Sequence, residues 1–137
     1  MSRSPRGRAP KPPVAQPTAN PERGEHELPL PDGVTYRLRP SKAARRAIEA
    51  KTGLAELALI RRGNTGELTL DQLAVIAVEL IRAGAEDEIT RNVGVEGIGD
   101  LIAEAALPAV TARLTLCLWD AAHGGRDTAG NAKAATA

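Results

Sequence analysis

The chain has 137 residues, about one domain, and its 18 basic and 17 acidic side chains nearly cancel. With no Phe, one Tyr and one Trp, it is a poor candidate for nucleic-acid recognition by base stacking on aromatic side chains. A single Cys excludes an internal disulfide and a Cys-based zinc site, and it suits a reducing cytosol. No apolar stretch approaches the ~20 residues that are needed to span a bilayer.

The two ends of the chain are predicted to be disordered. Residues 1–25 hold six of the ten prolines and carry five basic against two acidic side chains, with almost no bulky apolar residue to bury. They suit either an arm that touches an acidic surface or nucleic acid, or, as the simpler interpretation, a solubilising leader. No apolar run follows the first arginines, so a secretory signal is not expected. Residues 125–137 are predicted to be a flexible tail, which leaves 26–124 as the ordered, mildly acidic domain.

Two short alternating segments, residues 26–30 and 34–38, predict a β-hairpin around the turn Pro31-Asp32-Gly33. On the second strand one face carries Val34, Tyr36 and Leu38, and the other carries Thr35, Arg37 and Arg39. Because an isolated hairpin is marginal in water, the apolar face is expected to pack on the rest of the domain, with Pro29 at an edge.

Everything after Pro40 is predicted to be helical. Ser41 can cap a helix that runs to about Lys51 and is broken by Thr52-Gly53, and a second short helix is expected over residues 54–63, ended by Gly63. Thr69-Leu-Asp-Gln72 is a capping box that opens a third helix to about Ala83. The apolar residues of this third helix fill an arc of ~200°, which is wide enough to predict the centre of a bundle.

The last part of the chain is predicted to hold one or two more helices. Ile98, Leu101, Ile102 and Ala105 have the i, i+3, i+4, i+7 spacing of an amphipathic helix. Pro108 either starts a new helix or kinks this one, and the segment around Ile89 and Val93 has no assigned structure. The predicted fold is therefore mainly α: a small bundle of about four to five helices preceded by a β-hairpin.

The final helix, residues 108–123, carries two apolar stripes. Val110, Leu114, Cys117, Leu118 and Ala121 form the main one, which is expected to dock the helix on the bundle. Ala112, Leu116 and Trp119 form a second stripe, and these three are the candidate partner-binding residues, since Trp is enriched where proteins meet partners. The alternative is that the second stripe packs under the hairpin against Tyr36.

Reactive or metal-binding constellations are not indicated. His26 and His123 have no metal-ligand spacing, and Cys117 lies on an apolar stripe, where a buried, inert thiol is the better interpretation. The glycines at 94, 97 and 99 lack the preceding strand and following Lys of a phosphate loop, and the acidic residues 86–88 lack the alternating ligands of a calcium loop. Neither catalytic residues nor a cofactor are predicted.

Residues 43–62 also have the outline of a helix-turn-helix, which keeps a DNA-binding regulator open as an alternative. Two features weigh against it. The folded part is net acidic, and Arg61 and Arg62 lie at the carboxyl end of the second helix, whereas recognition helices read bases with their amino-terminal residues.

The order of these features resembles the tail assembly chaperone family of gene transfer agents and related siphophage-like particles. The resemblance spans roughly residues 27–124: the run Leu30-Pro-Asp-Gly-Val-Thr-Tyr-Arg-Leu-Arg39, then Ile48-Glu49 ahead of Thr52-Gly53, then Gly66-Glu-Leu-Thr-Leu-Asp-Gln-Leu-Ala-Val-Ile76, and the final helical block to Gly124.

The resemblance implies a non-enzymatic, cytoplasmic role in a bacterial host. Such proteins bind the long tape measure protein, keep its apolar helices soluble, aid polymerisation of the tail tube, and are absent from the mature particle. The implied partners are the tape measure protein and the tail tube protein, with self-association allowed, and no specific nucleic acid, membrane or small-molecule substrate is implied. A structural tail component that stays in the particle is the remaining alternative.

Overall fold

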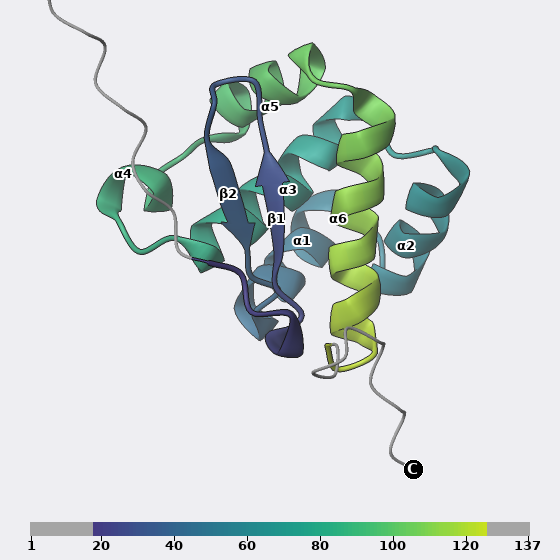
Figure 1. Cartoon of the computed structure of the whole chain (residues 1–137). Coiled ribbons are helices and arrows are strands. Elements are labelled where there is room, and N and C mark those ends of the chain that lie inside the picture. The colour runs from purple at the N-terminus through teal and green to yellow at the C-terminus, as the bar shows by residue number, and fades with distance from the viewer. Residues whose placement is uncertain (1–17, 126–137) are drawn as a thin grey trace, which may run out of the picture.

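A computed structural model describes residues 18–125 (Figure 1). The described chain is mainly helical, with a two-stranded antiparallel hairpin ahead of six α-helices, which confirms the predicted fold class. The elements are η1 (Pro21–Arg23), β1 (His26–Pro29), β2 (Thr35–Leu38), α1 (Lys42–Thr52), α2 (Glu56–Thr65), α3 (Leu70–Gly84), α4 (Glu88–Arg91), α5 (Val95–Glu104) and α6 (Leu107–Ala122). The predicted tails fall largely outside the described residues, at 1–17 and 126–137. Within 18–125, none of the helices has the length and apolar character needed to cross a membrane.

The hairpin forms where the sequence predicted it. Strands β1 and β2 pair with Leu28 opposite Tyr36, and both side chains are buried together with Leu38. The Asp32 carboxylate closes the turn, since it accepts hydrogen bonds from the Val34 N–H at 3.1 Å and from the Tyr36 hydroxyl at 2.7 Å. Strand β2 packs on α3 and β1 on α6, so the hairpin covers one side of the helical core.

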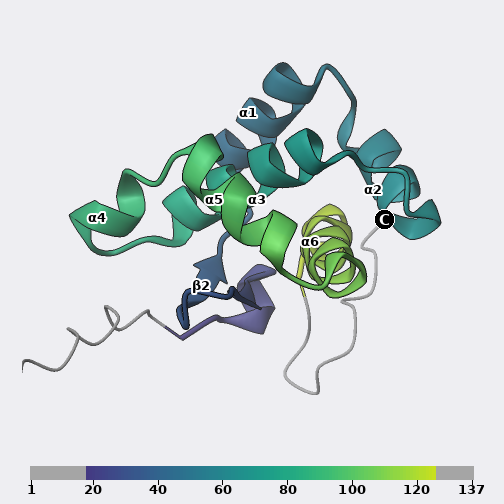
Figure 2. The same cartoon turned by 90° about the horizontal axis from the view of Figure 1, so that it is seen from above.

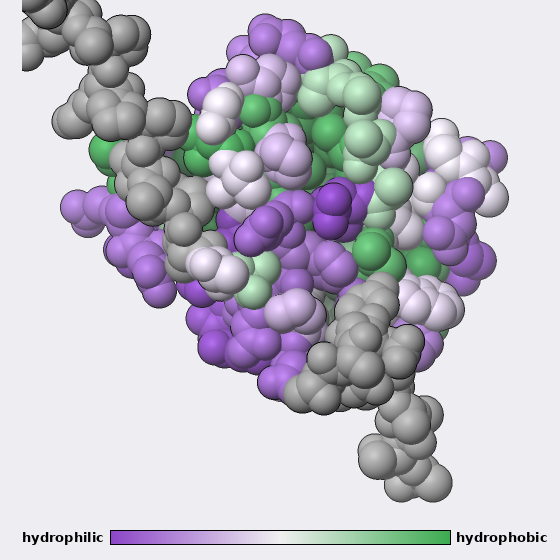
Figure 3. Space-filling view, in the orientation of Figure 1, coloured by the Kyte–Doolittle hydropathy of each residue, from purple (hydrophilic) through white to green (hydrophobic). Residues whose placement is uncertain are grey.

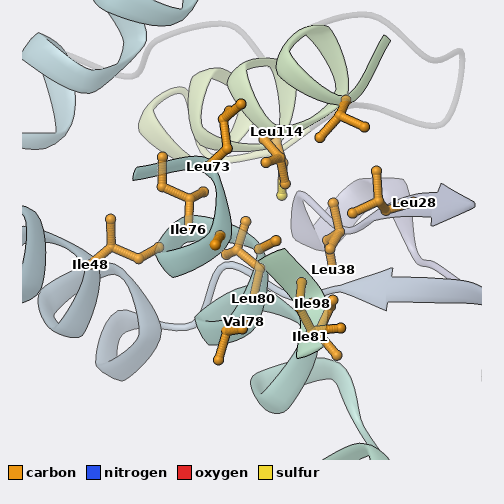
Figure 4. Close-up of a cluster of buried hydrophobic side chains, with 14 of the residues drawn as sticks. Leu28, Leu38, Ile48, Leu73, Ile76, Val78, Leu80, Ile81, Ile98 and Leu114 are labelled. Atoms are coloured by element: carbon orange, nitrogen blue, oxygen red, sulfur yellow. The ribbon is translucent and has the colours of Figure 1, made fainter. Parts of the chain in front are cut away.

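Helix α3 lies at the centre, as its wide apolar arc predicted. The capping box is present, with Thr69 accepting from the Gln72 N–H and the Gln72 side chain accepting from the Thr69 N–H. Strand β2 and helices α1 and α5 pack around α3, and Figure 2 shows α3 and α5 lying between α1 and the hairpin. Figure 4 shows Leu73, Ile76, Val78, Leu80 and Ile81 of α3 in the resulting core. Ala74 and Ala77 of α3 are buried as well.

Helix α2 extends further than predicted. The expected end at Gly63 is wrong: the helix runs to Thr65, and Gly66, with φ +72°, provides the left-handed cap. Gly63 is needed for packing instead. A Cβ atom at Gly63 would lie 2.0 Å from Oγ1 of Thr115 on α6, so only glycine lets α2 and α6 approach this closely.

The described residues contain six α-helices where about four to five were predicted, and the additional one is a single turn. The unassigned segment around Ile89 contains the one-turn helix α4, capped by the Asp87 carboxylate on the Thr90 N–H. Pro108 lies in the first turn of a separate helix, so it starts α6 and does not kink α5.

Ordered structure begins before residue 26, contrary to the predicted boundary. Helix η1 is capped by Asn20, and Glu25 is only 2% exposed, with ion pairs to Arg23 and Arg37. Gly125 is also buried and donates to the Asp120 carbonyl at 2.7 Å. The proline-rich composition concealed this order, because Glu25 pairs with Arg37 of β2 and the Gly24 carbonyl accepts from Cys117 of α6, which is 93 residues away.

Removing residues 1–25 is therefore expected to destabilise the protein relative to removing residues 1–17. The longer deletion takes away buried Glu25 and the Gly24 carbonyl, which accepts from the Cys117 thiol at 3.6 Å. Thermal melts followed by circular dichroism should differ by more than about 5 °C, equivalent to roughly 1 kcal/mol for a domain of this size. Equal melting temperatures would mean that this segment does not stabilise the core.

Gly63→Ala is expected to destabilise the protein by about 1–3 kcal/mol, since the new methyl group overlaps Thr115 and forces α2 away from α6. The matched control is Gly97→Ala on α5, where a Cβ meets nothing within 4 Å. That change should be neutral or stabilising by up to ~1 kcal/mol, as expected for Gly to Ala inside a helix. Urea denaturation of both variants measures the difference, and equal effects would contradict the close packing of α2 on α6.

Candidate functional site

A groove of about 890 Å³ lies between α6 and the segment that joins α2 to α3. None of its lining residues is charged: Gly63, Asn64, Gly66, Leu68, Leu70, Leu73, Leu107, Pro108, Thr111, Ala112, Thr115, Leu116 and Trp119. We call it the α6 groove. Its volume lies at the upper end of the range for pockets that hold a small molecule.

One face of α6 forms the long wall of the α6 groove. Pro108, Ala112, Thr115 and Trp119 line it at the three- and four-residue steps that keep side chains on one side of a helix. From Pro108 to Trp119 this wall is about 16 Å long, or roughly three helical turns. The opposite face of α6 holds the buried residues Val110, Leu114, Cys117 and Leu118, so the two predicted stripes serve two different surfaces.

The second wall is the turn between α2 and α3. Gly66 ends α2, and Thr69 caps α3 three residues later, so the connection is short and the side chains of Leu68 and Leu70 line the groove. The close contact of Gly63 with Thr115 joins the two walls. The Thr115 hydroxyl is buried there and has no hydrogen-bond partner among the described residues.

Large apolar side chains are exposed around the groove. Trp119 is 42% exposed, Leu70 48% and Leu107 40%, and all three line it. Figure 3 shows hydrophobic residues at the surface beside α6, on the side facing α2. An apolar surface that is concave and collected in one place is typical of a binding site, whereas single exposed apolar residues are not.

The three candidate partner-binding residues all lie in this groove. Ala112 and Trp119 are exposed, and Leu116 is half-buried. The alternative, in which their stripe packs under the hairpin against Tyr36, is wrong, because Trp119 is 42% exposed and the stripe lines the groove together with the segment that joins α2 to α3. The Trp119 ring instead lies beside the His123 ring, with centroids 4.1 Å apart, and the Trp119 carbonyl is 2.8 Å from Nδ1 of His123.

The cysteine, the histidine and the glycines that the sequence analysis considered as possible functional residues have structural roles instead. Cys117 is fully buried, and burial raises the pKa of its thiol well above the usual range, as expected for an inert cysteine. His26 reaches Asp120 of α6, with Nε2 and Oδ2 2.6 Å apart, so it ties β1 to α6.

The glycines considered for a phosphate loop belong to helix α5. Gly94 precedes α5 as its N-cap residue, and Gly97 and Gly99 lie inside that helix. Within residues 18–125 no cluster of three or more His, Cys, Asp or Glu side chains is placed to hold a metal ion.

The possible helix-turn-helix corresponds to α1 and α2. Arg45 of α1 binds Glu56 of α2 in a bidentate ion pair, at 2.7 and 2.6 Å, and the Glu49 carboxylate accepts from the Glu56 N–H at 2.8 Å. The amino-terminal end of α2 is therefore occupied by contacts with α1. Arg61 and Arg62 are exposed at its other end.

Sequence reasoning missed the wall formed by Gly63, Gly66, Leu68 and Leu70. By its spacing Leu70 belongs to the apolar arc of the central helix, but at the first position of α3 it reaches the surface. The short connection between a glycine cap and a capping box was the available signal, because it forces the flanking side chains close together.

Comparison with protein-family models, with curated proteins and with solved structures gives no match for this chain.

Proposed function

We propose that this protein is a tail assembly chaperone of a phage-like particle, such as a gene transfer agent, and that it holds an apolar helix of the tape measure protein in the α6 groove. The α6 groove is the observation that carries the proposal: an uncharged, open surface with Trp119 at one end. The sequence resemblance supplies the class of partner. Binding of an amphipathic helix in an apolar groove is a common mode of peptide recognition.

The energetics favour a helix-binding role. Trp119, Leu70 and Leu107 are each roughly half exposed, and burying a large apolar side chain completely contributes about 1.5–3 kcal/mol. In the free protein about half of each side chain stays in contact with water. A partner that covers the groove would bury this remaining apolar surface, which favours binding. Binding also stabilises the tape measure helix, because the groove keeps the apolar face of that helix out of water until the tail tube closes around it.

The proposed role is non-enzymatic and cytoplasmic, with the tail tube protein as a second contact during polymerisation. Two alternative functions differ from this proposal: a DNA-binding regulator built on α1 and α2, and a structural component that stays in the tail. The contacts between α1 and α2 described above leave α2 less free to enter a DNA groove, and the lining of the α6 groove offers no charged side chain to phosphates.

Trp119→Ala is expected to weaken binding of the tape measure protein by ~2 kcal/mol or more, since a large aromatic contact is lost. Folding stability should change far less than the ~3–5 kcal/mol expected for a core Trp, because Trp119 is 42% exposed. Ile89→Ala is the matched control, as Ile89 on α4 is 75% exposed and lies outside the groove. Calorimetric titration and urea denaturation measure the two effects.

Tryptophan fluorescence gives an independent result, because Trp119 is the only Trp in the chain. Emission of the free protein should be that of a partly exposed indole and should shift to the blue when the tape measure protein is added. A spectrum unchanged by a partner that demonstrably binds would place the partner elsewhere and refute the assignment of the groove.

Purified particles are expected to lack this protein, although cell lysates of the producing strain contain it. Quantitative proteomics of particles and lysate measures the ratio. A fixed, stoichiometric amount in finished particles would identify a structural tail component and contradict the chaperone proposal.

A further inference from the structure

A second hollow, of about 690 Å³, lies along α2 and shares no lining residue with the α6 groove. We call it the α2 hollow. Leu57 lies one turn before Arg61 on the same face of α2 and is 61% exposed, so apolar surface and basic side chains occur together here. The lining residues of the α2 hollow are Leu54, Ala58, Arg61, Arg62, Thr65 and Glu67.

The positive charge of the α2 hollow is only partly neutralised by its neighbours. Arg61 and Arg62 are exposed, and within residues 18–125 neither forms an ion pair. The one carboxylate of the lining belongs to Glu67, which accepts a hydrogen bond from the Thr65 hydroxyl at 3.0 Å. Two arginines against one glutamate leave the hollow basic, so it favours an acidic occupant.

Acidic residues gather around the one-turn helix α4. Residues 86–88 are all acidic, and Arg91 is the one basic residue of α4. Oε2 of Glu86 lies 3.8 Å from Nη2 of Arg37 on β2, whereas Glu88 is exposed and forms no ion pair with any other described residue. The surface of α4 therefore carries negative charge that is available to a partner.

Ile89 lies next to Glu88 on α4, and we call these two residues the α4 patch. Ile89 is 75% exposed and Leu57 is 61% exposed, which makes them the two most exposed large apolar side chains among the described residues. One lies beside an exposed acid and the other beside an exposed arginine. A contact between the α4 patch and the α2 hollow would bury both apolar side chains and bring opposite charges together.

The two surfaces lie at opposite ends of the molecule. Figures 1 and 2, which are views at right angles to each other, both place α4 at one end and α2 at the other, with α3 and α6 between them. A single copy therefore cannot bring its own α4 patch to its own α2 hollow, but two copies can meet in this way. A contact between two different patches of the same chain is heterologous, so it builds rings or open rows of copies.

We propose that this chain associates head to tail, with the α4 patch of one copy seated in the α2 hollow of the next. The lining residues of the α6 groove belong to neither surface, so every copy in such an assembly keeps its groove open. The inference goes beyond the proposed function and does not depend on it. Ile89→Ala, the control for the groove, leaves the groove of each copy intact and weakens only the contact between copies.

Sedimentation velocity of the full chain tests the association. One exposed apolar side chain on each side and a few exposed ion pairs make a small interface, so the association is expected to be weak. The average mass should rise over about a hundredfold range of concentration and fall again in about 0.5 M salt, which screens exposed charges.

Charge reversal identifies the α2 hollow. Arg61→Glu combined with Arg62→Glu places like charges against the α4 patch and should weaken association about tenfold or more. Lys42→Glu combined with Arg46→Glu makes the same change of net charge on exposed side chains of α1, outside both surfaces, and should leave association unchanged. Circular dichroism melts of both double variants check that they remain folded.

Mixing two blocked variants tests the head-to-tail geometry. The double variant at 61 and 62 keeps its α4 patch, and Ile89→Asp keeps its α2 hollow. Each should be monomeric alone. Mixed together they should form one-to-one dimers and nothing larger, because one intact patch and one intact hollow remain for each pair of chains.

The proposal is overturned if the full chain stays monomeric at every concentration, or if the two blocked variants stay monomeric when mixed. Association that Leu116→Asp relieves would make the α6 groove the interface. Association that is lost on deleting residues 1–17 would make that basic segment the occupant of the α4 patch. A monomeric chain whose retention on DNA is lost with Arg61 and Arg62 would make nucleic acid the occupant of the α2 hollow.

Discussion

Burial of α3 is the constraint on which the rest of the structure depends. Its apolar residues occupy more than half of its circumference, so a single neighbour cannot cover it. Strand β2 and helices α1 and α5 surround it, and Leu73, Ile76 and Leu80 are buried among them. The Arg39 N–H donates to the Leu80 carbonyl at 3.0 Å, so even the backbone of α3 helps to hold the hairpin. A chain without Phe builds its core from many aliphatic side chains around one helix.

The α6 groove follows from how the remaining helices meet this centre. Helix α6 uses one stripe for β1 and the core, which leaves its second stripe facing outwards beside α2. The contact of Gly63 with Thr115 holds α2 against the middle of α6, and the turn at Gly66 then leads the chain to α3. The α6 wall and the groove beside it are thus consequences of helix packing. A side chain at Gly63 would therefore alter the fold together with the groove.

Local patterns predicted most of the elements and half of the site. The hairpin, the capped central helix and both stripes of α6 were readable because turn chemistry, caps and helical period act over a few residues. Gly63 was misread for the same reason: a glycine near the end of an apolar segment usually ends a helix, but here Thr115, far along the chain, requires the absence of a side chain. The order at residues 18–25 was missed because it depends on contacts with β2 and α6.

The groove is held open by contacts at both ends of its long wall. Pro108 presets the first turn of α6, and at the other end Asp120 is bound to His26 of β1 and its carbonyl accepts from the Gly125 N–H. The opposite wall is fixed by the capping box at Thr69. A site that does not have to be ordered first binds more tightly, so these polar contacts, distant from the apolar lining, would lower the entropic cost of binding the proposed partner. Under the proposal, a change at His26 would weaken binding through the position of α6, without touching the partner.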